Sequence, residues 1–152
     1  MNNNNIVMFI KPNSLVYKEE ILSILDNISS CYKVYDMICT KKFLESLYSE
    51  HRNKRFFDKL ITYYIDKKIC VILFYDRNKI FGKIKNIVWH KDPAHAHPNT
   101  IRSMFSNDSL TVANKENRII NNVVHFQENK NKMVYEIDLF ESYLFKYDNA
   151  FA

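Results

Sequence analysis

The stretch Ile69-Cys70-Val71-Ile72-Leu73-Phe74-Tyr75 is an unbroken apolar run with the length of a β-strand. Continuous apolar character, without alternation between apolar and polar residues, is typical of a central strand that is covered on both faces. The run is far shorter than the roughly 20 residues that a membrane-spanning helix needs. It therefore predicts a sheet with helices packed against it, and it gives no indication of a membrane segment.

The elements on either side of this strand predict an antiparallel sheet. Ile6–Ile10 is a second buried strand, and Lys11-Pro12-Asn13-Ser14 is typical of an exit turn because Pro cannot continue the ladder. Further strands are expected at 33–39 and, from the alternation of its residues, at 135–140. Helical spacing predicts helices at 18–28, 43–48, 56–64 and 78–88, with a shorter segment at 100–105. This order is the βαββαβ arrangement of the ferredoxin-like α+β class.

The length and composition suit a single domain over residues 1–152. A chain of 152 residues, with 47% hydrophobic and 26% charged residues, is long enough to bury a real core. The polar, irregular stretch at about 108–120 predicts a protruding loop inserted in this domain, not a second domain. The tail is expected to pack on the body or on a neighbouring subunit through Tyr143, Leu144, Phe145, Tyr147 and Phe151.

Charge and composition favour some classes of ligand over others. A net charge of +5 and a sequence pI of about 9.0 favour anionic partners such as nucleotides, phosphates or nucleic acid. The chain has one glycine, Gly82, which excludes Gly-rich phosphate loops, so any phosphate must be held largely by side chains. Three cysteines without CxxC spacing indicate neither a disulfide framework nor a zinc cluster. Because the N-terminus lacks a signal-peptide pattern, we expect a soluble cytoplasmic protein.

The strongest candidate for chemistry is Asn121-Asn122-Val123-Val124-His125, followed by Glu136. A histidine on a short apolar segment, with a carboxylate further along to orient its ring, is suited to act as a nucleophile or base at neutral pH. The same pattern also fits a packed structural histidine. His95 and His97 could hold a metal ion, but no third ligand is nearby, so a surface loop is favoured and no resident metal site is predicted.

Further motifs accompany His125 in a fixed order along the chain. They are Lys11-Pro12-Asn13-Ser14; Tyr48-Ser49-Glu50-His51 followed by Phe56-Phe57; Asp92-Pro93-Ala94 followed by Pro98-Asn99-Thr100-Ile101-Arg102; and Asn122-Val123-Val124-His125-Phe126-Gln127-Glu128-Asn129. Glu136 lies eleven residues beyond His125. In their order and spacing, these motifs resemble those of the nucleoside diphosphate kinases over nearly the whole chain.

The resemblance implies a ping-pong kinase reaction. His125 would take the γ-phosphate of ATP or another nucleoside triphosphate and give it, through phosphohistidine, to a nucleoside diphosphate. Mg²⁺ would bridge the phosphates and be held mainly by them, and a homo-oligomer (dimer, tetramer or hexamer) is implied. The implied roles are positive charge toward the phosphates from Lys11, Lys85 and Arg102, orientation of His125 by Tyr48 and Glu136, a sugar contact from Asn122, and a clamp on the base from Phe56 and Leu60.

Several residues depart from the family pattern. Phe126 and Gln127 stand where the family has Gly-Ser, and Phe126 is expected to crowd the histidine. Lys91 stands at the position of a phosphate-loop threonine, where it could bind phosphate or obstruct it. About ten extra residues before Asn122 are expected at the rim of the pocket, as a lid or a subunit contact.

These departures leave an alternative function open. The protein could be a catalytically weakened or inactive nucleotide-binding or scaffold protein on the same fold. Nucleic-acid binding is not favoured, because the predicted sheet lacks a pair of exposed stacking aromatics flanked by basic residues.

Overall fold

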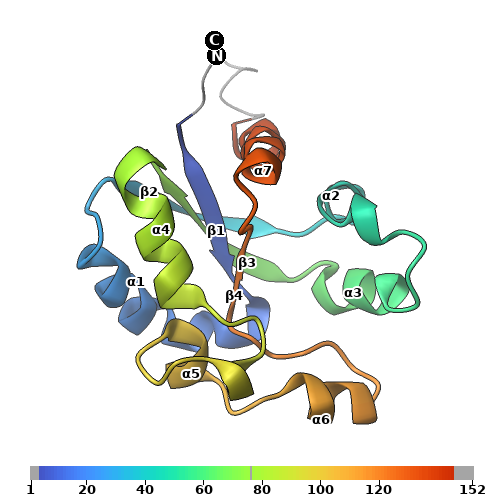
Figure 1. Ribbon diagram of the computed structural model, residues 1–152. Coiled ribbons are helices and arrows are strands. Elements are labelled where there is room, and N and C mark those ends of the chain that lie inside the picture. The colour runs from blue at the N-terminus through green and yellow to red at the C-terminus, as the bar shows by residue number, and fades with distance from the viewer. Residues whose placement is uncertain (1–3, 76, 146–152) are drawn as a thin grey trace.

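The structure, a computed structural model that describes residues 4–75 and 77–145, contains an antiparallel sheet (Figure 1). Its strands are β1 (Ile6–Ile10), β2 (Tyr32–Ile38), β3 (Lys68–Phe74) and β4 (Val124–Phe126), in the spatial order β2-β3-β1-β4. β3 pairs with β1 on one side and with β2 on the other, so the apolar run that begins at Ile69 is an inner strand, as predicted. This strand order confirms the ferredoxin-like class.

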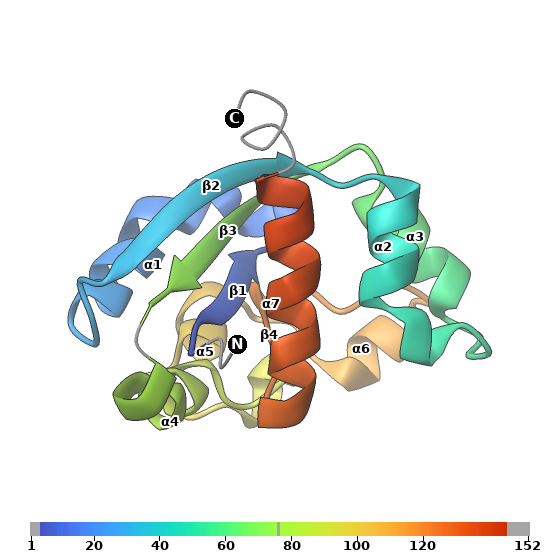
Figure 2. The same cartoon turned by 90° about the horizontal axis from the view of Figure 1, so that it is seen from above.

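Helices cover both faces of the sheet (Figure 2). α1 (Lys18–Asp26) and α4 (Arg77–Val88) lie on one side, and α7 (Lys130–Leu144) lies on the other, next to α2 (Lys41–Leu47) and α3 (Phe57–Tyr64). The short elements are η1 (Pro12–Tyr17), η2 (Ser49–His51), η3 (Pro93–His95), α5 (Ile101–Phe105) and α6 (Leu110–Lys115). Among the described residues, no helix is long and apolar enough to cross a membrane.

Residues 135–140 belong to α7, so their prediction as a strand is wrong. Glu136 and Asp138 alternate with apolar residues, which suggested a strand. The buried positions of the helix, however, are Met133, Glu136, Ile137 and Phe140. These positions lie three and four residues apart and form one helical face. The fourth strand of the sheet is instead β4, which carries His125.

The described part of the tail packs on the body of the same chain. This was one of the two predicted arrangements, the other being packing on a neighbouring subunit. Tyr143 contacts Phe43 of α2 with 5.1 Å between ring centroids, and Phe145 contacts Tyr35 of β2 at 5.6 Å. Tyr147 and Phe151 lie outside the described residues.

Alanine substitutions can test which face of α7 is buried. Met133→Ala removes a fully buried side chain and is expected to lower the free energy of unfolding by roughly 2–5 kcal/mol. Val134→Ala, on the exposed side of the helix, is expected to change it by less than about 0.5 kcal/mol. Equilibrium unfolding in urea measures both values, and equal losses would contradict the helical face.

Candidate active site

The register of β4 decides which way His125 points. Phe9 of β1 lies directly opposite His125 in the antiparallel ladder. The imidazole of His125 stacks on Phe9, with 4.8 Å between ring centroids and 11° between the ring planes. Tyr48 meets the same imidazole edge-on at 6.0 Å. Because Phe9 also contacts Phe140 of α7, His125 lies on the face of the sheet that α7 covers.

Glu136 of α7 holds one nitrogen of the His125 ring. Nε2 lies 3.0 Å from each carboxylate oxygen of Glu136. A carboxylate only accepts hydrogen bonds, so Nε2 carries the ring proton and Nδ1 has a free lone pair. No described residue makes a hydrogen bond with Nδ1. The predicted contact between His125 and Glu136 is therefore present, and it leaves one ring nitrogen available as a nucleophile.

A strained turn precedes β4. Val123 has φ 74°, in the left-handed region that β-branched residues seldom adopt, and the N–H of Val124 donates to the carbonyl of Asn122 at 2.8 Å. Together these features identify a γ-turn of the rare, strained kind. The guanidinium of Arg102 holds this turn from both sides: Nε donates to the carbonyl of Asn122 at 3.0 Å, and Nη2 donates to that of Val124 at 2.9 Å. Nη1 donates to the carbonyl of Val88 at 3.1 Å.

Lys11 and Asn122 form a buried polar contact beside the turn. The ammonium of Lys11 donates to Oδ1 of Asn122, and the amide nitrogen of Asn122 donates to the carbonyl of Lys91 at 2.8 Å. Burial, together with the nearby charge of Arg102, lowers the pKa of Lys11 from 10.5 to about 7. Burial also lowers the pKa of Arg102 to about 10. Both buried cations would gain from an anionic ligand, since it would favour their charged forms.

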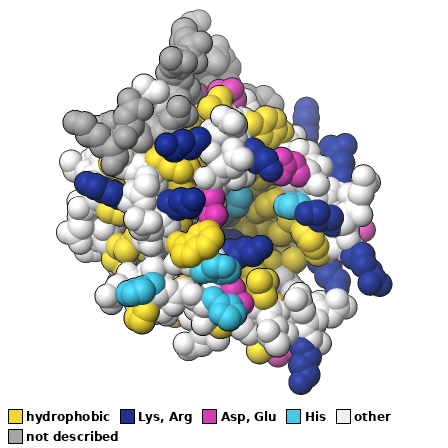
Figure 3. Space-filling model, viewed as in Figure 1, with side chains coloured by type: hydrophobic (Ala, Val, Ile, Leu, Met, Phe, Trp, Pro, Cys, Tyr) yellow, Lys and Arg dark blue, Asp and Glu magenta, His cyan; other side chains and the backbone are white. Residues whose placement is uncertain are grey.

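An open cavity of about 530 Å³ lies in front of His125. Figure 3 shows this face of the molecule hollowed, with apolar side chains inside the hollow and Lys and Arg side chains around it. Phe56, which is 40% exposed, and Leu60 form part of its wall. The sequence-predicted residues that line it are Lys11, Tyr48, Phe56, Leu60, Lys91, Asn122 and His125.

The three other predicted residues lie outside this cavity. Glu136 contacts His125 but does not line the cavity. Arg102 lines a second cavity of about 550 Å³, which shares His51 and Lys91 with the first. In the described part of the chain, Lys85 lines neither cavity. Its ammonium lies 6.0 Å from the ring centroid of Trp89, which lines the second cavity. Arg102 and His125 therefore line neighbouring cavities that meet at His51 and Lys91.

The chain is similar to known proteins over nearly its whole length. The family model described as nucleoside diphosphate kinase matches residues 4–144. The chain belongs to the nucleoside diphosphate kinase family. A nucleoside diphosphate kinase from Wigglesworthia glossinidia brevipalpis is 32% identical over 94% of this chain and 92% of its own length. One from Methanocaldococcus jannaschii is 29% identical over 73% of this chain and 69% of its own length.

Solved structures of nucleoside diphosphate kinases share the fold. The enzyme from Borrelia burgdorferi, a transition-state mimic with bound vanadate and ADP, has a TM-score of 0.78 at 17% identity, covering 89% of this chain and 84% of that chain. An NDP kinase from Pyrobaculum aerophilum has a TM-score of 0.75 at 19% identity, covering 89% of this chain and 93% of that chain. At these identities the likeness concerns the fold alone.

Phe126 does not crowd His125, contrary to the expectation from the family's Gly-Ser. It points to the opposite face of the sheet, where its ring contacts Phe81 of α4 with 5.3 Å between centroids. The side chain of Gln127 reaches forward along the chain, and its Oε1 accepts the backbone N–H of Asn129 at 3.0 Å, just before α7. Strand alternation thus allows a bulky residue next to His125 in this family member.

A wall of the cavity comes from residues 108–120, which we call the strap. The strap contains the short helix α6, where the sequence predicted an irregular loop. Arg118 forms two hydrogen bonds with the carboxylate of Asp108, at 2.6 and 2.9 Å, and one with Glu116 at 2.5 Å. The Arg118 guanidinium beside Asp108 holds the pKa of that carboxyl well below its usual range. The strap residues that line the cavity are Leu110, Ala113, Asn114, Arg118, Ile119 and Ile120.

The sequence interpretation placed the strap at the rim but named none of its residues as site residues. The helical spacing of Leu110, Ala113 and Asn114 is the signal that could have found three of them. His51 and Lys54 also line the cavity. His51 stood in a quoted motif, whereas Lys54 lay in a polar link that carried no further signal.

Lys11→Met tests the effect of the buried ammonium on stability. Because the folded-state pKa of Lys11 lies below its unfolded value, the charge opposes folding fully below about pH 7, and this cost disappears as the pH rises toward 10.5. The substitution is therefore expected to raise the free energy of unfolding by roughly 1–4 kcal/mol near pH 6, with a smaller gain near pH 10. Urea unfolding across this pH range measures the change. Exposed Lys42→Met is the control, and a gain in Lys11→Met that does not vary with pH would contradict the buried-charge account.

Asp108→Ala tests whether the ion pair with Arg118 orders the strap. Loss of the carboxylate also removes an acceptor for the backbone N–H of Asn121, 2.8 Å away. Amides of the strap are expected to exchange hydrogen several-fold faster, while those of β1 and β3 stay unchanged. Hydrogen-exchange mass spectrometry measures this, with Asp138→Ala on the exposed side of α7 as the matched control. Unchanged exchange in the strap would show that other contacts order it.

Proposed function

We propose that this family member is an active nucleoside diphosphate kinase that uses His125 as its nucleophile. The observation that carries the proposal is the contact of Nε2 with Glu136, which leaves Nδ1 free beside a cavity of nucleotide size. In the first half-reaction, the Nδ1 lone pair attacks the γ-phosphorus of ATP or another triphosphate, the bond to the bridging oxygen breaks, and the diphosphate leaves. In the second, a terminal oxygen of an acceptor diphosphate attacks the phosphorus and the phosphorus–nitrogen bond breaks.

The walls of the cavity suit the parts of a nucleotide. Phe56 offers an exposed aromatic face for a base, with Leu60 beside it. Lys11 and Asn122 lie deeper, between the end of β1 and the start of β4, where they would contact the phosphates and the sugar. Tyr48 limits the rotation of the catalytic imidazole through its edge contact.

The phosphates would lie near the boundary between the two cavities. Phosphoryl transfer depends mainly on positioning and on positive charge around the transferred group. Lys91, exposed at this boundary, and Arg102, on its far side, would supply that charge together with Lys11. Arg102 also acts as a positioning residue, because it holds the turn that presents His125. A phosphate role for Lys85 stays a prediction, since its nearest link to the site is Trp89.

A divalent cation belongs to the reaction of this family. The described residues that line the first cavity include no acidic side chain, and the described part of the chain has no group of three His, Cys, Asp or Glu side chains suited to a metal. This donor set fits a cation that arrives on the nucleotide. Mg²⁺, held mainly by phosphate oxygens, would neutralise part of their charge.

Family membership supports general statements about assembly, but it does not fix the number of subunits or the location in the cell. The family binds nucleotides and is generally oligomeric. Three statements about this chain stay predictions: that it forms a dimer, tetramer or hexamer, that it is cytoplasmic, and that it is a single domain with the strap as an insertion. No feature of the cavity favours the alternative of an inactive nucleotide-binding or scaffold protein.

Incubation with γ-labelled ATP and Mg²⁺ tests the kinase reaction. The wild type is expected to acquire an acid-labile label and to pass it to a different nucleoside diphosphate, whereas His125→Ala acquires none. Glu136→Gln is expected to slow labelling on the order of 10²-fold, because Nε2 loses a charged acceptor. His97→Ala, in the exposed loop, is the control and should behave as the wild type. Wild-type protein that binds nucleotide yet takes no label would refute the proposal.

A further inference from the structure

α6 turns one face toward the cavity in front of His125, which we call the nucleotide cavity. Leu110, Ala113 and Asn114 line the cavity, and their spacing of three and four residues puts them on the same face of the helix. α3, which carries Leu60, and α6 lie on different sides of this region (Figure 1). Phe56 and Asn114 therefore line the same cavity, so a base that stacks on Phe56 would share this cavity with the carboxamide of Asn114.

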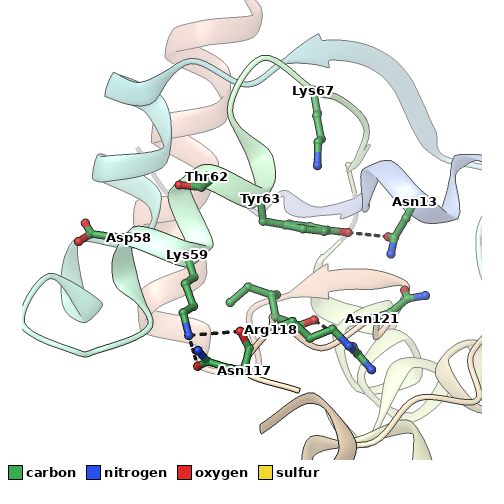
Figure 4. Close-up of a pocket in the computed structure, with 10 residues that line it drawn as sticks. Asn13, Asp58, Lys59, Thr62, Tyr63, Lys67, Asn117, Arg118 and Asn121 are labelled. Atoms are coloured by element: carbon green, nitrogen blue, oxygen red, sulfur yellow. Dashed lines mark hydrogen bonds between the residues drawn. The ribbon is translucent and has the colours of Figure 1, made fainter. Parts of the chain in front are cut away.

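The strap is attached firmly enough to present a side chain in a defined place. Lys59 of α3 donates to the carbonyl of Asn117 at 3.2 Å and also contacts its side-chain oxygen (Figure 4). Arg118 is held within the strap by Asp108 and Glu116. A separate cavity of about 600 Å³ is lined by Lys59 and Asn117, and it shares Arg118 and Ile119 with the nucleotide cavity. The wall is thus supported from α3 as well as from its own ion pairs.

The side chains of Asn114 and Lys54 are among those in the nucleotide cavity that can meet a ligand. Within the described ranges, neither the carboxamide of Asn114 nor the ammonium of Lys54 makes a hydrogen bond or an ion pair. The ammonium of Lys54 lies over the ring of Phe56, 5.7 Å from its centroid, and so stands beside the surface on which a base would stack. By contrast, the side chain of Arg118 is engaged by carboxylates, and that of Lys11 by Asn122.

We propose that Asn114 and Lys54 read the edge of the nucleobase and favour guanine, uracil and thymine over adenine and cytosine. An ammonium only donates hydrogen bonds, so Lys54 suits an oxo group, while the carboxamide oxygen of Asn114 accepts from a ring N–H. Guanine, uracil and thymine carry an oxo group next to a ring N–H. Adenine and cytosine carry an amino group there, which opposes a second donor. This selectivity rests on the proposed function, because it concerns the base of the kinase's nucleotide.

Calorimetric titration with GDP, UDP, ADP and CDP tests the selectivity. The wild type is expected to bind GDP and UDP about five- to tenfold more tightly than ADP and CDP. In Asn114→Leu and in Lys54→Met, the ratio should fall to within about twofold, because each loses one of the paired contacts. Lys115→Met, which removes one charge from the same helix without touching the cavity, is the control and should keep the wild-type ratio.

The outcomes separate this inference from the kinase reaction. Equal wild-type affinities for the four diphosphates, or a ratio that persists in Asn114→Leu, would overturn the base-reading role even if His125 becomes labelled. A ratio that depends on Asn114 and Lys54 supports the role even if no label forms, since calorimetry measures binding without turnover. The same four diphosphates, offered as acceptors to phosphorylated protein, should show the same order of kcat/KM.

Discussion

The pairing of Phe9 with His125 across β1 and β4 is the constraint on which the site depends. Because side chains alternate along a strand, this register puts the imidazole on the face of α7 and hence against Glu136. A slip by one residue would turn the ring to the α4 face and bring Phe126 into the cavity. Phe9 is itself packed against Phe140 in the core, so the ring of His125 rests on a rigid support.

β4 is only three residues long, so its register needs support from outside the ladder. Arg102 supplies that support through the carbonyls on both sides of Val123, and the backbone N–H of Lys11 donates to the carbonyl of Val123 at 2.9 Å. The left-handed backbone at Val123 costs on the order of 1–3 kcal/mol, which these bonds oppose. A buried cation thus fixes backbone geometry at the same place where it adds positive charge to the site.

Much of the site could be predicted because its residues come in short motifs whose order survives divergence. His125 and Glu136 were found in this way, and the structure brings them into contact. The same Glu136 misled the prediction of secondary structure: it is buried to reach His125, so a polar residue interrupts the apolar face of α7 and imitates strand alternation. The hydrogen bonds of Arg102 could not be predicted from the sequence, because their acceptors are backbone carbonyls, which every residue has. The spacing of residues in α6 shows that they share one face of a helix, but the sequence does not show that this face points into the cavity.

The electrostatics of the site connect its stability to its ligand. The cavity gathers cations without acidic side chains among its described lining residues, and the ammonium of Lys11 is removed from water beside Arg102. With its pKa lowered to about 7, Lys11 is only partly charged near neutral pH until an anion enters. A polyphosphate would favour the charged form and replace repulsion between cations with attraction to the ligand. Lys11, whose buried charge opposes folding, is therefore a group whose environment a bound nucleotide would improve, and binding would stabilise the folded state.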